Sequence, residues 1–147
     1  MSIRRKSREM ALQVLFCMDV LDDCSEALTE ELCLLLEPSE KVRPFGLELV
    51  RGVIGHKTEI DAGLAEASSN WKLARMDYVD RNIIRIAAYE ILFCEDIPPK
   101  VAINEAVDIG KKYGTEKSGA FINGILDSIR QGYGKREAET EGMAGDE

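Results

Sequence analysis

The chain has 147 residues, of which 45% are hydrophobic and 31% charged, and its formal net charge is −8. This length allows one domain or two small subdomains with a real core. No run of eighteen apolar residues occurs, so we expect no membrane-spanning segment. The basic N-terminus leads into an amphipathic pattern rather than a secretory signal, which favours a cytoplasmic protein.

The charges are unevenly distributed. Residues 1–8 carry four positive charges and no negative one, whereas residues 9–66 carry thirteen acidic and four basic side chains. A basic arm on an acidic body suits an anion such as nucleic acid at the arm and a basic protein on the acidic face. A solvated surface with a mobile arm is the alternative, and charge alone leaves both open.

Helical periodicity runs through the N-terminal half. We predict a first helix over 7–20, a second that begins after a Ser25 cap and ends at Pro38, and a third that starts near Pro44 and can extend to Leu64. Residues 68–76 break this pattern and are predicted to join two halves of the chain.

The central element is predicted over 81–93, where nine of thirteen residues are apolar. A helix that is apolar round most of its circumference must be covered on most sides by its neighbours. Asp77 is the expected N-cap, and the segment 96–99, which ends in two prolines, stops this helix.

Two helices are expected after it. Pro99 suits the first turn of one that Gly114 ends, and Ser118 can cap a last helix that Gly132 closes. The sequence therefore predicts an all-α fold with an N-terminal subdomain (1–70) that carries the basic arm, a C-terminal subdomain (71–132) and a disordered acidic tail (133–147).

Groups that could support catalysis are scarce. The chain has one histidine, His56, and its four cysteines form no C-x-x-C pair, so we expect reduced thiols, no metal site and no cofactor. Glu105 and Asp108 could be paired carboxylates, but Lys111 and Lys112 follow at the spacing of ordinary ion pairs on a helix surface. We predict no catalytic site.

Two segments are candidates for binding nucleic acid. The first holds four cations within five residues, which can neutralise phosphates: Arg4, Arg5, Lys6 and Arg8. The second is K-S-G-A-F-I-N-G at 117–124, where Phe121 follows the start of a helix whose free N–H groups attract phosphate. Phe121 could stack on a base, or it could be a core residue that fixes the start of the helix.

Several motifs together resemble the NusB family of transcription antitermination factors. They are R-R-K-S-R-E-x-A-L-Q-x-L-F at 4–16, R-N-I-I-R-I-A-A-Y-E-I-L at 81–92, D-I-P-P-K-V-A-I-N-E-A-V-D-I-G-K-K-Y-G at 96–114 and F-I-N-G-I-L-D at 121–127. The resemblance implies a NusB-like fold of two small helical-bundle subdomains around the central helix. It also implies binding to boxA of nascent ribosomal RNA, together with a small-subunit ribosomal protein (NusE), on RNA polymerase elongation complexes with other Nus factors.

The resemblance also implies residue roles. RNA contact would fall to Arg4, Arg5, Lys6, Arg8, Lys117, Ser118 and Phe121, and the ribosomal protein would lie near Phe16, Met18 and Asp80. Two positions depart from the family pattern: Ala120 replaces a frequent Lys before the Phe, and Asp80 replaces a longer Glu. The competing hypotheses are a protein-binding or homodimeric helical module that does not touch RNA, and an enzyme that uses Glu105 and Asp108.

Overall fold

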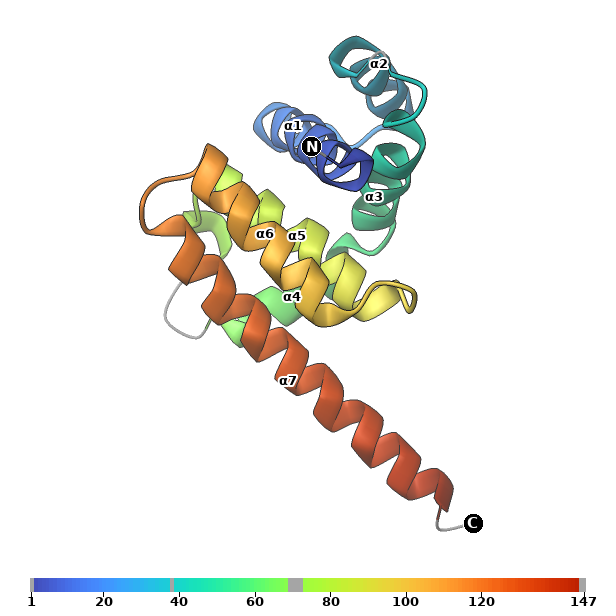
Figure 1. Ribbon diagram of the computed structural model, residues 1–147, viewed down its shortest axis with the longest axis vertical. Coiled ribbons are helices and arrows are strands. Elements are labelled where there is room, and N and C mark those ends of the chain that lie inside the picture. Colours follow the sequence, from blue (N-terminus) through green and yellow to red (C-terminus); the bar gives the residue numbers. More distant parts are fainter. Residues whose placement is uncertain (1, 38, 69–72, 146–147) are drawn as a thin grey trace.

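The computed structural model describes residues 2–37, 39–68 and 73–145, with side chains up to residue 132 (Figure 1). This part of the chain forms seven α-helices, one 3₁₀ turn and no strand, which confirms the predicted all-α class. The elements are α1 (Ile3–Leu21), α2 (Glu26–Leu36), α3 (Arg43–Gly55), α4 (Lys57–Ala67), η1 (Leu73–Arg75), α5 (Tyr78–Phe93), α6 (Pro99–Tyr113) and α7 (Ser118–Gly145). None of these helices combines the length and apolar content needed to cross a membrane.

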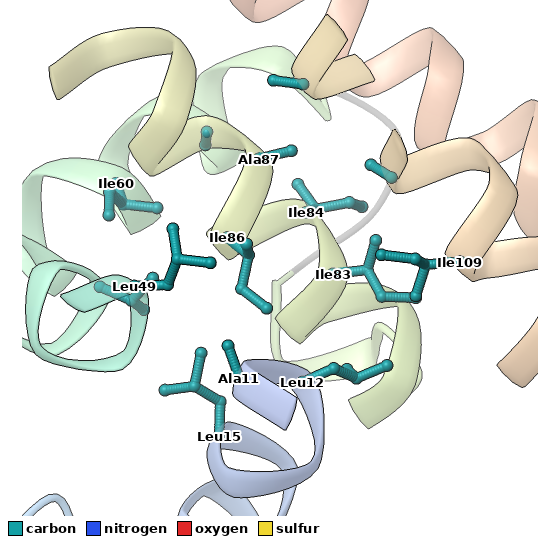
Figure 2. Packing of buried hydrophobic residues seen from close by; sticks show 14 of the residues in the cluster. Ala11, Leu12, Leu15, Leu49, Ile60, Ile83, Ile84, Ile86, Ala87 and Ile109 are labelled. Carbon is teal, nitrogen blue, oxygen red and sulfur yellow. The ribbon is translucent and has the colours of Figure 1, made fainter. Parts of the chain in front are cut away.

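Helix α5 is the centre of the fold, as the sequence predicts. It packs against α1, α3, α4, α6 and α7. Figure 2 shows Ile83, Ile84 and Ile86 of α5 among side chains from several of these neighbours. Asp77 caps α5 by accepting a hydrogen bond from the backbone N–H of Val79 (2.7 Å). Because α5 is apolar nearly all round, its burial requires helices on opposite sides of it.

Helix α1 begins earlier than residue 7, where the sequence placed it. The Ser2 side chain accepts a hydrogen bond from the backbone N–H of Arg5 (3.0 Å), so the helix starts at Ile3. The basic segment is therefore the first turns of a helix rather than an extended arm. This fixes the direction in which each of its cations points.

The third predicted helix is divided in two. It ends at Gly55, and α4 starts at Lys57 after a break at His56. Helix α4 packs against α5 and α7, so it lies with the C-terminal helices, although it falls in the first half of the chain. The division of the chain into subdomains at residue 70 stays a prediction.

The last helix does not end at Gly132, where the sequence predicts its end, and the disordered tail (133–147) stays a prediction. Helix α7 continues to Gly145 instead of closing at Gly132. Residues 135–139 are good helix formers, and extending an existing helix fixes one residue for each hydrogen bond gained. Two glycines at 132 and 134 are not enough to stop it.

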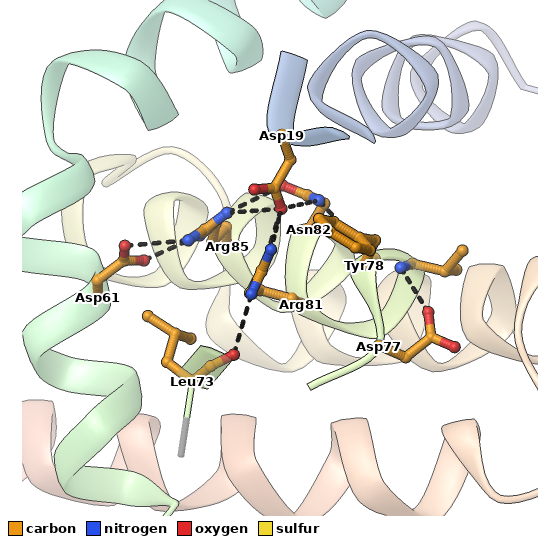
Figure 3. A network of polar contacts seen from close by, with 9 residues as sticks. Asp19, Asp61, Leu73, Asp77, Tyr78, Arg81, Asn82 and Arg85 are labelled. Carbon is orange, nitrogen blue, oxygen red and sulfur yellow. Dashed lines mark hydrogen bonds and ion pairs between the residues drawn. The ribbon is translucent and has the colours of Figure 1, made fainter. Parts of the chain in front are cut away.

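A polar network connects α1, α4 and α5 (Figure 3). Asp19 of α1 accepts hydrogen bonds from Arg81 Nη2 (2.8 Å), Asn82 Nδ2 (2.9 Å) and Arg85 Nη1 (3.2 Å) of α5. Arg85 also donates to both carboxylate oxygens of Asp61 in α4 (2.9 and 3.0 Å). Burial alone would raise the pKa of Asp19, but the hydrogen bonds from Arg81 and Asn82 and the nearby arginine charges outweigh it and hold the pKa below its ordinary value.

Asp19→Asn should destabilise the protein at pH 7 by about 3 kcal/mol, because two buried arginines lose their shared counter-ion. A carboxylate with a lowered native pKa contributes stability above its unfolded pKa of about 3.9, and this contribution is lost as the pH falls through the native pKa. Urea denaturation of both proteins at pH 7 and pH 3 should show the difference shrinking at pH 3.

Asp127→Asn provides the control, since Asp127 is exposed and its carboxylate accepts from Gln131 on its own helix. This variant should unfold like the wild type at both pH values. A deficit for Asp19→Asn that is as large at pH 3 as at pH 7 would contradict the role of the Asp19 charge.

Candidate nucleic-acid interface

The two segments predicted to bind nucleic acid flank one helix. The first half of α1 runs along α6, where Glu9 accepts hydrogen bonds from Lys112 Nζ and Tyr113 Oη (2.5 and 2.8 Å). The start of α7 packs closely on α6, since a Cβ at Gly119 would lie 3.3 Å from Cε of Lys111. In Figure 1, α6 accordingly lies between α1 and α7.

We name this surface the α6 face. It comprises side chains from the first half of α1, from α6 and from the region where α7 begins: Arg5, Lys6, Glu105, Asp108, Lys111, Lys117 and Phe121. Residues more than a hundred positions apart in the sequence thus lie on one side of the molecule.

The four cations of the basic segment occupy different environments. Arg4 and Lys6 are exposed, and neither forms an ion pair with any described residue; the Arg4 guanidinium lies 4.0 Å from the centre of the Phe45 ring. Arg5 is paired with Glu105 and, at 3.0 Å, with Asp108. Only part of this positive charge is therefore available to an external anion.

Arg8 is the clearest departure from the expected RNA contacts. It is 4% exposed and donates two hydrogen bonds to Glu90 of α5, from Nε (2.8 Å) and Nη2 (2.6 Å). Its position is visible in the sequence, since residue 8 lies on the same helical stripe as the apolar Ala11, Leu12 and Leu15. A cation on an apolar stripe indicates a buried ion pair, and Arg8 is placed to hold α1 on α5.

The predicted ion pairs on the surface of α6 are not the ones observed. Glu105 and Asp108 pair with Arg5 of α1, while Lys112 pairs with Glu9. Spacing along one helix predicts partners within that helix, and it carries no information about a partner supplied by another helix. The two carboxylates are therefore neutralised in part across the α1–α6 contact.

The second segment also divides into exposed and buried residues. Lys117 is exposed, whereas Ser118 is 1% exposed and its hydroxyl accepts a hydrogen bond from the backbone N–H of Thr115 (2.9 Å). Ser118 thus shapes the loop before α7 and is not open to direct contact. Phe121 is half-buried and packs against the core with part of its ring, which agrees with a core role, and its role in stacking on a base stays a prediction.

The residues expected to face a protein partner lie elsewhere on α1 and α5. Phe16 is 37% exposed and meets the ring of Tyr78 edge-on, with 6.1 Å between the ring centres. Met18 is 1% exposed and belongs to the core, which does not fit contact with a partner. Two exposed apolar residues beside Phe16 were not predicted from sequence periodicity. Tyr78 contacts the Phe16 ring and is 43% exposed, and Val20 follows one turn later in α1 and is 53% exposed.

Asp80 has an unusual environment. Its Oδ1 atom is buried and has no hydrogen-bond partner among the described residues. Burial raises the pKa of this carboxyl above its ordinary value, and the Ser118 hydroxyl counteracts part of the effect.

Comparison with known proteins decides the family. The model described as "NusB family" matches residues 5–131. The chain belongs to the NusB family. Curated relatives named transcription antitermination protein NusB include that of Desulfosudis oleivorans, 49% identical over 142 residues (95% of this chain, 92% of the relative), and that of Desulfatibacillum aliphaticivorans, 50% identical over 137 residues (93% and 96%).

Solved structures of NusB proteins agree with this assignment. NusB of T. maritima is 38% identical, with a TM-score of 0.78 over 87% of this chain and 90% of that protein. A crystal structure of the antitermination factors NusB and NusE in complex with dsRNA contains a chain that is 28% identical, with a TM-score of 0.79 over 90% and 99% of the two chains. The all-α architecture is thus the NusB fold.

No group of three or more His, Cys, Asp or Glu side chains in the described part of the chain is arranged to hold a metal ion. The four cysteines are unpaired, and only Cys33 is buried. The charged groups on the α6 face are instead arranged as ion pairs and as cations that have no acidic partner among the described residues.

Arg8→Met should lower the stability of the protein by about 3 kcal/mol, because it leaves the Glu90 carboxylate buried without its partner. Lys6→Met makes the same chemical change on the exposed side of α1 and should change stability by less than about 0.5 kcal/mol. Thermal unfolding followed by circular dichroism measures both. Equal, small shifts in Tm would show that Arg8 has no structural role.

Proposed function

We propose that this chain is a transcription antitermination factor that binds boxA-type single-stranded RNA of nascent ribosomal transcripts on its α6 face. It works in the cytoplasm together with the ribosomal protein NusE and other Nus factors on RNA polymerase elongation complexes, and it has no catalytic activity of its own. Its relatives carry the antitermination name over nearly their full length. The observation that carries the proposal is the meeting of both predicted RNA-binding segments beside α6.

The RNA backbone is bound by cations that have no acidic partner in the described structure. Lys6, Lys111 and Lys117 of the α6 face meet this condition, and so does Arg4 at the start of α1, beside this face in the sequence. If all four neutralise phosphates, log K for RNA falls with log salt at a slope of roughly −3. Arg8 and Ser118 act indirectly, by holding α1 and the loop before α7 in place.

Phe121 supplies the stacking surface for a base. Part of its ring is exposed at the start of α7, four residues after Lys117. Stacking on an aromatic ring contributes about 1–3 kcal/mol per base in single-strand complexes. A cation and an aromatic ring one turn apart allow a phosphate and its base to be bound together.

The ribosomal protein is bound by a separate surface. Phe16 and Tyr78 form an exposed aromatic pair, and Asp80 stands in the first turn of the same helix as Tyr78. Aromatic side chains are common anchors of protein interfaces, and the half-buried Asp80 carboxylate can receive a cation from NusE. A NusB–NusE complex in the structural relative supports this proposal.

A protein-binding or homodimeric module that does not touch RNA is the second candidate. The exposed apolar side chains of Phe16, Val20 and Leu21 favour it, because they form a surface suited to a protein partner. The two candidates differ in one respect, namely whether substitutions on the α6 face change the affinity for RNA.

Lys117→Ala should weaken binding of a labelled boxA-type RNA and make the salt slope shallower by about 0.7, the contribution of one phosphate contact. Fluorescence anisotropy across a salt series measures both quantities. Lys41→Ala, which removes an exposed lysine between α2 and α3, is the matched control and should leave the slope unchanged. The same small effect from both substitutions would favour the protein-only candidate.

Phe121→Leu separates base stacking from packing, since leucine preserves most of the apolar contact and removes the aromatic ring. RNA affinity should fall about tenfold, while thermal stability changes by less than about 1.5 kcal/mol. Unchanged affinity with a lower Tm would assign Phe121 to the core alone.

Asp80→Asn should weaken binding to purified NusE by about 2 kcal/mol in calorimetry, because the partner loses a buried counter-charge. The free protein should not be destabilised at pH 7. The Asp80 carboxyl has a raised native pKa, so the folded protein loses stability as the pH rises through that pKa. The amide of asparagine does not ionise, and the variant therefore does not lose this stability. A variant that binds NusE normally would contradict the proposed contact.

A further inference from the structure

Arg5 is the one arginine of the basic segment that both reaches the α6 face and is held by acidic side chains. Its Nε atom donates to Glu105, and its Nη2 atom donates to Asp108 at 3.0 Å. Glu105 also lies 3.7 Å from Nη1 of Arg8. The guanidinium of Arg5 is thus held on α6 by two carboxylates one helical turn apart.

The charges at this point do not favour an external anion. Arg5 contributes one positive charge and its two partners contribute two negative charges, while the buried Arg8–Glu90 pair is neutral as a whole. A phosphate that approaches Arg5 therefore meets a net negative charge. The sequence R-R-K-S-R suggests the opposite, because it does not show the acidic residues that α6 brings to this position.

The exposure of this cluster distinguishes it from an ion pair that stabilises the fold. The side chains of Arg8 and Glu90 are 5% and 1% exposed, whereas those of Arg5 and Asp108 are 26% and 55% exposed. An exposed pair contributes little to stability and exchanges readily with water and ions. Nη1 of Arg5 also has no hydrogen-bond acceptor among the described residues, so its N–H groups remain available as donors.

We infer that Glu105 and Asp108 are internal counter-ions of Arg5 that an RNA phosphate must displace, so that these two carboxylates set the affinity of the α6 face for RNA. The inference rests on the proposed RNA-binding function and specifies how that site is regulated. Binding exchanges the Arg5–Asp108 contact for an Arg5–phosphate contact. Asp108, the more exposed carboxylate, is the one that moves away.

Asp108→Asn tests this directly, because it removes the exposed counter-ion and keeps the shape of the side chain. Anisotropy with a boxA-type single-stranded RNA should show binding about fivefold tighter, the effect of one unit charge at about 4 Å in water. The salt slope should become steeper by about 0.7, because the variant has no displaced Asp108 carboxylate that takes up a salt cation when the phosphate pairs with Arg5. Thermal unfolding should be unchanged.

Glu31→Gln is the matched control for charge, since Glu31 is an exposed residue of α2 and forms no ion pair with the described residues. It makes the same change in net charge away from α6 and should alter RNA affinity by less than about twofold, in keeping with screening over more than about 10 Å. An equal gain from both variants would mean that total charge alone governs binding, and would overturn the inference.

The double variant Arg5→Met/Asp108→Asn separates release of Arg5 from simple repulsion of RNA by Asp108. The gain from Asp108→Asn should disappear when Arg5 is absent. A gain of the same size in both backgrounds, or no gain in either, overturns the inference. If the wild type binds neither boxA-type nor scrambled RNA, the proposed function itself fails; if Arg5→Met weakens binding while Asp108→Asn gives no gain, only the counter-ion role fails.

Discussion

The burial of α5 on nearly every side is the constraint from which the rest of the structure follows. A helix with isoleucines at 83, 84 and 86 and alanines at 87 and 88 cannot leave one face in water without losing much of its stabilisation. Helices α1 and α6 therefore both pack on it, and their charged side chains meet as ion pairs. That packing brings the basic start of α1 beside α6 and so creates the surface proposed to bind RNA.

Charged residues then determine how the helices are fixed to α5. Arg8 meets Glu90, and Asp19 meets Arg81 and Arg85, so α1 is attached to α5 by ion pairs near both of its ends. Buried charges of this kind cost much desolvation, and they are retained only when their partners are well placed. They also divide the cations of α1 into those that hold the fold together and those that remain free for an anion.

Much of the fold could be predicted from the sequence, because helical periodicity and capping residues are local signals. The cap at Asp77, the first turn at Pro99 and the end at Gly114 all lie where they were expected. The start of α1 was missed because Ser2 precedes a run of charged residues that has no apolar periodicity. The length of α7 is not evident from apolar periodicity, because the residues after Gly132 are polar although several of them are good helix formers.

The candidate site could be predicted only in part. The sequence named both segments, but whether a cation is free or paired depends on residues that lie about a hundred positions away, as for Arg5 and Glu105. The burial of Arg8 and Met18 could be predicted from the sequence, since each lies on the apolar stripe of α1. The position of a residue around α1 therefore determines whether it belongs to the core or to a binding surface.

The most direct test of RNA binding at the α6 face is photochemical cross-linking of a boxA-type RNA to the wild-type protein, with the linked peptides identified by mass spectrometry. We predict cross-links at the starts of α1 and α7, with Phe121 among the linked residues, and competition by unlabelled boxA-type RNA but not by a scrambled sequence. Cross-links concentrated on α2, or equal competition by both RNAs, would contradict specific RNA binding on the α6 face.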